Sequence, residues 1–300
     1  MSLRLAVATE DFGASLRRAI VQAAKAQVRG IRLNARTEVN PKHTTDSALR
    51  QLAHYVGEQQ MQIAGLICPT KHALSDPEFL EERLDLIRRA MALARKLNTV
   101  ELLIRCGRIP DPETSEEREP LPSNSDVESL ANPFSFAGST GRSTKTVASS
   151  SQKFAMLSEI VSDLARHGNH VGCVPHLQFA AYDVALIRKL LASVNTGPVA
   201  IAFDPATAVM TGSDVVTAFR DLYNDVGYIR ARDAIRDVDG AGVEVPVGDG
   251  NVDWTEFLPT LAEADFSGWV CVERTGGDDR ANDVLAGVAR MKKLIPQAGS

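Results

Sequence analysis

Eight β-rich runs alternate with eight amphipathic helical runs along almost the whole chain, and this alternation restricts the possible folds more than any other feature. LRLAVAT (3–9) and QIAGLIC (62–68) are typical of the strands. A long run with a period near 3.6 residues starts at Asp76, which we expect to cap that helix with Pro77 at its first position. Strictly alternating strands and helices form a parallel sheet, and eight such units predict a closed (β/α)8 TIM barrel.

The alternation of strands and helices continues into the last third of the sequence, so we expect a single domain over the 300 residues. An open doubly wound sheet is the alternative. It lacks support because no G-x-G-x-x-G turn follows the first strand. The further expected strands cover 31–35, 100–106, 170–176, 199–204, 227–233 and 268–274.

The regular alternation is interrupted between the fourth strand and the fourth helix. Residues 108–150 are rich in Ser, Pro, Glu, Thr and Gly and poor in aliphatic side chains. A connection of this length inside a compact domain is usually functional or disordered. Two interpretations follow: a lid over the barrel, anchored by Phe134 and Phe136, or a solvated insertion.

Composition excludes several classes of protein. The net charge of −5 gives no support to binding of nucleic acid or of a membrane surface. No apolar run approaches the roughly 20 residues that span a bilayer. The four cysteines are widely spaced and lie in apolar runs, so we expect buried thiols in a reducing cytoplasm, with a four-cysteine metal site as the alternative: Cys68, Cys106, Cys173 and Cys271.

The barrel prediction also indicates where chemistry would take place, since active sites of such barrels lie at the carboxyl ends of the strands. The side chains expected there include five arginines, a histidine and three carboxylates: Arg32, Arg105, His176, Asp204, Arg230, Arg232, Asp233, Glu273 and Arg274. Of these, Arg274 is expected to point away from the barrel axis, and Asp233 to orient a neighbouring group or cap the next segment.

The last third of the chain resembles a known family. VPVGDGNVDWTEFLPTLAEADFSGWVCVE, from Val245 to Glu273, is similar to the closing segment of the xylose isomerase-like TIM barrels, which include sugar-phosphate isomerases and epimerases and the endonuclease IV type of DNA-repair enzyme. The pattern combines a G-x-G-x-x-D turn, an amphipathic helix, a second turn and a strand ending in Glu. It is carried by Gly248, Gly250, Asp253, Phe266, Gly268 and Glu273.

This resemblance implies a divalent metal (Mn, Mg, Co or Zn) at the barrel mouth, bound by a Glu ending strand five, an Asp ending strand six, a His on strand seven and a Glu ending strand eight. Asp204 and Glu273 match two of these ligands. Val174 stands at the strand-five position, with His176 two residues on as a substitute, and Arg230 replaces the strand-seven His. If a metal binds at all, the expected ligands are Asp204, Glu273 and His176.

Arg230 argues against that metal, because a fixed positive charge would face a dication. Even between two unit charges, repulsion at about 4 Å costs on the order of 4 kcal/mol at an effective dielectric constant of 20. A guanidinium can instead neutralise two converging carboxylates, so we expect Arg230 to bridge Asp204 or Glu273 and no cofactor to be needed. The bridge is either an inert salt-bridge cluster or, with Arg105 and Arg32, part of an anion pocket.

The resemblance favours a sugar or sugar-phosphate isomerase or epimerase that uses Asp204, Glu273 and His176 as acid/base groups and the arginines for substrate binding. The alternative is a non-catalytic barrel that binds a small anionic carbohydrate or metabolite. A DNA-repair endonuclease would need a full set of zinc ligands, which the chain lacks. The sequence does not identify the substrate or the oligomeric state.

Overall fold

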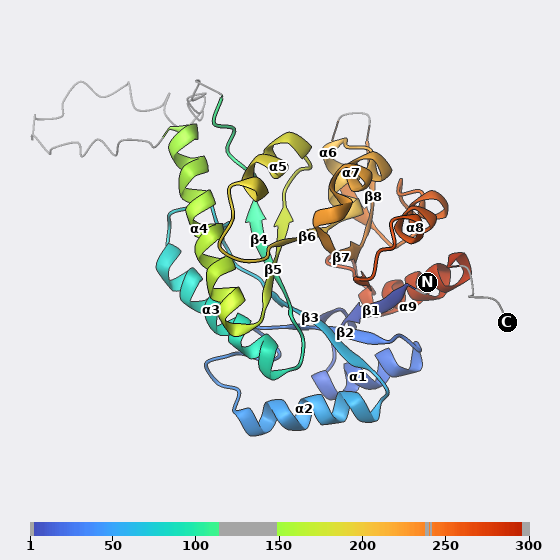
Figure 1. Cartoon of the computed structure of the whole chain (residues 1–300). Helices are drawn as coiled ribbons and strands as arrows, with labels where there is room; N and C mark the ends of the chain where they lie inside the picture. Colours follow the sequence, from blue (N-terminus) through green and yellow to red (C-terminus); the bar gives the residue numbers. More distant parts are fainter. Residues whose placement is uncertain (1–2, 114–148, 238–239, 241, 296–300) are drawn as a thin grey trace, which may run out of the picture.

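The computed structural model describes residues 3–113, 149–237, 240 and 242–295, and eight parallel strands in it close into a barrel (Figure 1). Their order around the barrel is β1-β10-β7-β6-β5-β4-β3-β2, so neighbours in sequence are neighbours in space. The closed parallel sheet confirms the predicted (β/α)8 fold. The strands are β1 (Arg4–Ala8), β2 (Gly30–Asn34), β3 (Gln62–Cys68), β4 (Glu101–Gly107), β5 (Val174–Phe179), β6 (Ala200–Phe203), β7 (Val226–Ala231) and β10 (Trp269–Val272).

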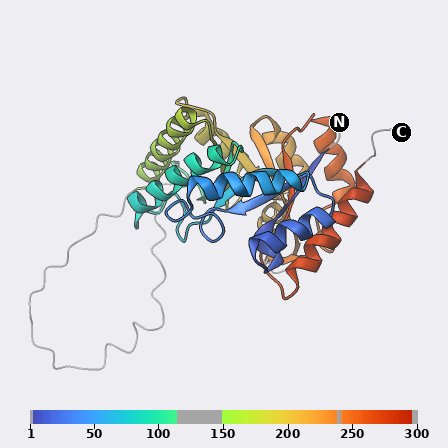
Figure 2. The same ribbon diagram turned by 90° about the horizontal axis from the view of Figure 1, so that it is seen from below.

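Helices cover the outside of the barrel, and α1, α2 and α3 can be followed along that surface in Figure 2. The described residues contain nine α-helices rather than eight, because two short helices, α6 and α7, connect β6 to β7. In the part of the chain that the structure describes, no helix is both long and apolar enough to cross a membrane. The helices are α1 (Leu16–Lys25), α2 (Asp46–Glu58), α3 (Leu80–Lys96), α4 (Ser150–Val171), α5 (Val184–Ala192), α6 (Pro205–Thr211), α7 (Val215–Leu222), α8 (Trp254–Glu263) and α9 (Arg280–Leu294).

The core has two layers, as the alternation of side chains along each strand requires. Outward-facing strand residues and the helices form one large apolar cluster. Inward-facing residues form a separate cluster inside the barrel, where small alanines accommodate two large aromatic side chains, Tyr228 and Trp269. Because inward residues recur every second position, this inner cluster fixes which residues point toward the barrel mouth.

Two predicted element boundaries are wrong. The helix expected from Asp76 begins at Leu80, because Phe79 takes a left-handed conformation at φ 51° and the Asp76 carboxylate caps the backbone N–H of Glu78 instead. The fifth strand was expected at 170–176, but α4 continues to Val171 and ends at a left-handed Gly172. Strand β5 therefore lies four residues later than predicted at its start.

A two-stranded antiparallel hairpin that the sequence did not predict follows β7, with strands β8 (Asp233–Arg236) and β9 (Gly242–Val245). Its first residue, Asp233, is fully buried and accepts hydrogen bonds from the backbone N–H of Gly248 and of Val252 and from the indole N–H of Trp254. A Cβ at Gly250 would collide with this carboxylate. The GDGNVDW run is thus wrapped around Asp233, which confirms the expectation that this residue organises the next segment.

The long connection between β4 and α4 spans 108–149, and residues 114–148, including the proposed anchors Phe134 and Phe136, lie outside the described residues. The lid and the solvated insertion both stay as hypotheses. The four cysteines are free and buried, as expected. Burial raises the pKa of the Cys68 and Cys106 thiols to about 12, so neither is a thiolate at neutral pH.

Candidate functional site

Charged side chains gather at the carboxyl end of the barrel, on the inner face of the strands. Tyr228 and Cys271 belong to the inner cluster, and two residues further along the same strands Arg230 and Glu273 point the same way. Asp204 directly follows β6. These residues are almost fully buried, at 8%, 2% and 3% whole-residue exposure for Arg230, Glu273 and Asp204, so their charges must be matched locally.

Arg230 lies between the two carboxylates that the family pattern singles out. Its Nε and Nη2 donate to Oε2 of Glu273 at 3.0 and 2.8 Å, and its Nη1 donates to Oδ2 of Asp204 at 3.3 Å. The predicted bridge is confirmed, and it reaches both carboxylates rather than one. A guanidinium that is hydrogen-bonded in this way supplies positive charge to both carboxyl groups without an added cation.

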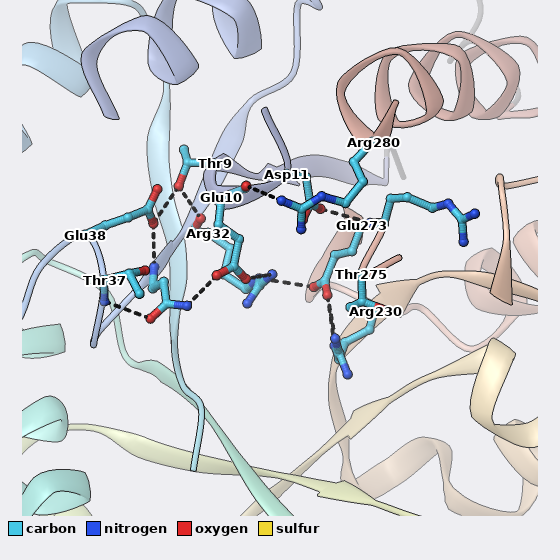
Figure 3. Close-up of polar contacts among 12 residues, drawn as sticks. Thr9, Glu10, Asp11, Arg32, Thr37, Glu38, Arg230, Glu273, Thr275 and Arg280 are labelled. Carbon is cyan, nitrogen blue, oxygen red and sulfur yellow. Dashed lines mark hydrogen bonds and ion pairs between the residues drawn. The ribbon is translucent and has the colours of Figure 1, made fainter. Parts of the chain in front are cut away.

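Glu273 has a second guanidinium beside it, that of Arg32, whose Nε lies 3.2 Å from Oε1 (Figure 3). Arg32 also donates through Nη2 to Glu10 at 3.0 Å. Burial alone raises the pKa of Glu273, but the positive charges of Arg230 and Arg32 outweigh burial and lower it below its usual value. The same balance, with Arg32 as the main partner, lowers the pKa of Glu10.

Asp204, like Glu273, lies between two guanidinium groups. Besides Arg230, it accepts a hydrogen bond from Nη1 of Arg232 at 2.6 Å, and its Oδ1 caps α6 through the N–H of Thr207. Arg232 in turn places Nε and Nη2 at 3.1 Å from the two carboxylate oxygens of Glu244, on strand β9. The unpredicted hairpin is therefore joined to the barrel mouth through charged groups.

We call this network the mouth cluster and define it by seven side chains in which three arginines face four carboxylates: Arg32, Arg230, Arg232, Glu10, Asp204, Glu244 and Glu273. Every arginine contacts two carboxylates, and every carboxylate contacts at least one arginine. The formal sum of three positive and four negative charges leaves no surplus cation in the cluster. The mouth thus supports the interpretation of a salt-bridge cluster better than that of an anion pocket.

Asp11, next to the mouth cluster, differs from its members. Its carboxylate accepts the backbone N–H of Arg274 at 2.9 Å and lies 3.5 Å from Nη1 of Arg280 (Figure 3). Burial raises the pKa of Asp11 to about 7, more than the nearby Arg32 lowers it. Asp11 is the one carboxylate among the described residues whose pKa is brought this close to neutrality.

His176 lies elsewhere in the barrel, which corrects the expectation that it ends the fifth strand. It is the third residue of β5, its Nδ1 is 3.0 Å from the carbonyl oxygen of Val174, and its ring meets Tyr228 edge to face at 6.3 Å. Burial lowers its pKa. On the inner face of β5, the residue nearer the mouth is Gln178, so the strand-five position does not correspond to Val174.

Of the other predicted arginines, one, Arg32, is part of the mouth cluster. Arg105 is exposed and donates to the carbonyl oxygen of Lys71 at 3.2 Å, without contact to the cluster. Arg274 pairs with Asp283 of α9 at 3.0 Å, and its Nη1 also lies 3.8 Å from Oε1 of Glu244, at the edge of the mouth cluster.

Sequence reasoning missed Glu10 and Glu244. Glu10 had a usable signal, because it follows the first strand directly, where mouth residues are expected. Glu244 had none, since its position depends on the hairpin.

The mouth cluster does not fit a divalent metal. Asp204 and Glu273 are the two family-type ligands, and the guanidinium of Arg230 lies between them at 2.8–3.3 Å. Arg32 and Arg232 add two further fixed positive charges against the same carboxylates. A dication among three guanidinium groups would be repelled by each on the order of 8 kcal/mol at about 4 Å and an effective dielectric constant of 20, since the interaction of two unit charges is about 4 kcal/mol there. The donor set is that of an ion-pair network.

Comparisons with known proteins agree with the fold. The family model described as xylose isomerase-like TIM barrel matches residues 20–294. A xylose isomerase domain protein from Planctomyces limnophilus superposes with a TM-score of 0.75 at 17% identity, covering 98% of each chain. The 3-keto-D-glucoside 4-epimerase from E. coli gives 0.67 at 14% identity, covering 97% of this chain and 99% of that one.

An L-ribulose 3-epimerase gives a TM-score of 0.68 at 11% identity, with 97% of this chain and 94% of the epimerase covered. At these identities the structural likeness shows the fold alone. No curated protein is similar enough in sequence to count as a match. The match of the family model over nearly the whole chain shows the family: this chain is a member of the xylose isomerase-like TIM barrels.

Proposed function

We propose that this barrel binds a small carbohydrate-type metabolite at its carboxyl-terminal mouth and does so without the divalent metal that its family relatives suggest. The observation that carries the proposal is the position of Arg230, which donates hydrogen bonds to both Asp204 and Glu273. A guanidinium there supplies the positive charge that the two carboxylates need. The free buried cysteines support a reducing, cytoplasmic setting for this role.

The chemistry of the mouth favours hydroxyl groups as the part of the ligand bound there. Side chains of the mouth cluster keep partial exposure, 10% for Arg230, 11% for Arg232, 12% for Glu244 and 29% for Glu10. They offer fixed donors next to fixed acceptors, and a hydroxyl group can use both. With the arginines already matched by carboxylates, a ligand anion would gain little from this cluster.

Isomerase or epimerase chemistry is the second candidate, and a specific arrangement favours it. Glu273 and Asp204 stand at the mouth as carboxylates that could accept a proton from a carbon beside a carbonyl group, and Arg230 contacts both. A guanidinium can stabilise the negative charge that then develops on oxygen. The lowered pKa of Glu273 makes it a weak base, so we expect slow proton exchange if the chain is catalytic.

Ligand titrations of the purified full chain test the binding proposal. We expect one or more neutral ketoses, aldoses or polyols of a panel to raise the thermal unfolding midpoint, equally with EDTA and with added Mn²⁺. The variant Glu10→Gln should weaken this response because it removes a charged acceptor at the exposed edge of the mouth. Binding that requires Mn²⁺, or no response to any panel member, would contradict the proposal.

Deuterium exchange from D₂O into the same ligands tests the catalytic candidate, with Glu273→Gln as the control. Exchange that Glu273→Gln abolishes supports proton transfer at the mouth. Ligand binding without exchange leaves the non-catalytic barrel, which is the form of the proposal that the ion-paired carboxylates favour.

A further inference from the structure

A pocket lies at the rim of the barrel, outside the mouth cluster. It is a cavity of about 400 Å³ between the segment that follows β2 and the segment that joins β3 to α3. This volume lies within the range of pockets for small molecules, about 300 to 1,000 Å³. Its lining combines four cationic side chains, Arg36, Lys42, Lys71 and Arg83, with one carboxylate, that of Glu82.

Arg83 is the central observation. It is only 6% exposed, yet no carboxylate of the described residues lies within ion-pair distance of its guanidinium. Its Nη1 donates to the carbonyl oxygen of Glu78 at 2.8 Å and its Nη2 to that of Asp76, while Nε is buried without a partner. Buried arginines are normally paired, because an uncompensated charge removed from water costs several kcal/mol.

Asp76, the carboxylate whose charge acts on Arg83, is engaged elsewhere. Asp76 accepts a hydrogen bond from the ring of His72 at 2.7 Å through Oδ2 and caps Glu78 through Oδ1. Burial lowers the pKa of Arg83, and the charge of Asp76 offsets this only in part. Because an arginine stays protonated at any ordinary pH, the pocket retains a positive charge that no ion pair among the described residues matches.

Other cations add to this charge from the open side. The ammonium groups of Lys42 and Lys71 are exposed, and each lines the pocket without a hydrogen bond or ion pair among the described residues. Arg36 uses one guanidinium nitrogen on the carbonyl oxygen of Pro69 at 3.2 Å. The other nitrogens of Arg36 stay available, so the pocket can offer several donors to an anion.

Phe79 supplies the apolar half of the site. The residue is 63% exposed at the pocket edge, and its backbone has the left-handed conformation, which costs a residue with a Cβ about 1 to 2 kcal/mol. Leu86 of α3 also lines the pocket. An exposed aromatic ring beside free cations fits a ligand that carries a flat apolar group next to its negative charge.

We infer that this rim pocket, with Arg83 at its base, Lys42 and Lys71 at its opening and Phe79 at its edge, binds a small organic anion in which a phosphate or carboxylate is joined to a flat apolar group. The inference does not rest on the proposed function, because none of these residues belongs to the mouth cluster. It describes a second site, with a ligand chemistry that the charge-balanced mouth does not offer.

Calorimetric titration with phenyl phosphate, inorganic phosphate and benzoate tests the inference on the full chain. We expect saturable binding of one phenyl phosphate per chain, about tenfold tighter than inorganic phosphate, which corresponds to about 1.4 kcal/mol from the aromatic contact. Benzoate separates the two anions: binding equal to that of phenyl phosphate indicates a carboxylate site, and weaker binding indicates a phosphate site. No saturable binding of any of the three overturns the inference.

Variants locate that binding. Lys42→Gln and Lys71→Gln should each weaken phenyl phosphate by about fivefold to tenfold, a change of about 1 to 1.4 kcal/mol. Phe79→Asn should remove the preference over inorganic phosphate, and Asn tolerates the left-handed backbone, so the fold is kept. Lys25→Gln on the exposed face of α1 is the control and should leave phenyl phosphate binding unchanged. Binding that is insensitive to all three pocket variants would place the ligand elsewhere and contradict the inference.

Arg83→Met distinguishes a ligand-binding arginine from a structural one. If the guanidinium serves the ligand, the variant loses phenyl phosphate binding and keeps or raises the thermal midpoint, because an uncompensated buried charge is removed. If it serves only to hold the carbonyl groups of Asp76 and Glu78, the midpoint falls and binding persists in the folded fraction, and that result contradicts the inference.

Discussion

Two nitrogens of Arg230 donate to one oxygen of Glu273, at 3.0 and 2.8 Å, although the residues are 43 positions apart in the sequence. The pairing fills the space in which the family pattern leads one to expect a metal ion. It also explains why Asp204 and Glu273 can converge in a buried barrel mouth: a guanidinium replaces the charge that they would otherwise lack.

Arg230→Met tests this charge replacement. The variant keeps much of the side-chain volume but leaves two carboxylates without their shared cation, so we expect the free energy of unfolding to fall by about 3 to 5 kcal/mol, measured by urea denaturation at neutral pH. Arg220→Met on the exposed face of α7 is the control and should change stability by about 0.5 kcal/mol or less. An equal, small effect of both variants would show that Arg230 is not needed for neutrality.

Acid stability should depend on Glu273. Its folded pKa is lowered, so its contribution to stability is complete above the unfolded pKa of about 4.3 and is lost as pH falls through the folded value. Glu273→Gln removes this dependence. Below pH 4 the difference in unfolding free energy between the variant and the wild type should therefore shrink relative to that at pH 7. A difference that is constant with pH would argue against a lowered pKa.

Asp11 should change the pH dependence of stability in the opposite direction to Glu273. Its folded pKa of about 7 lies above the unfolded value, so the folded state retains a proton that the unfolded state has lost, and stability falls as pH rises from about 4 to about 7. The slope from this group is at most about 1.4 kcal/mol per pH unit. Asp11→Asn keeps an acceptor for the N–H of Arg274 and should flatten the profile in this window, gaining stability relative to wild type at pH 8.

Gly227 and His176 should be energetically coupled. A Cβ at Gly227 would lie 2.5 Å from Nε2 of His176 and 3.0 Å from Cβ of Ala200, so Gly227→Ala should cost about 1 to 3 kcal/mol. His176→Ala alone leaves a cavity, and the double variant partly fills it. We expect the double variant to be more stable than the sum of the single effects by about 0.5 kcal/mol or more. Additive effects would mean that a methyl group at position 227 does not meet the ring of His176.

Asp233→Asn probes the centre of the GDGNVDW segment. The carboxylate accepts several N–H groups, and an amide offers only one acceptor oxygen and adds a donor among donors. We expect a loss of about 2 to 3 kcal/mol. Hydrogen exchange should rise first at Gly248 and Val252, and Asp253→Asn at the exposed cap of α8 gives the matched comparison.

Local sequence was enough to predict the fold and most residues of the mouth cluster. Alternating periodicity places each strand and helix, because a period of two or of 3.6 depends on neighbouring residues alone. The position of Arg230, Asp204 and Glu273 at strand ends then follows from the rule that parallel strands end together. The bridge between them was predictable, since two like charges at one barrel end require a cation.

The tertiary structure alone decided the rest. His176 was misplaced because α4 continues through His170 and Val171, residues whose local pattern suits a strand equally well, and only packing against the barrel settles that boundary. Glu244 reaches Arg232 through a hairpin with no strong turn signal. The uncompensated charge of Arg83 is invisible in sequence, because any nearby acid could have paired with it, and pairing depends on distances that only the folded chain fixes.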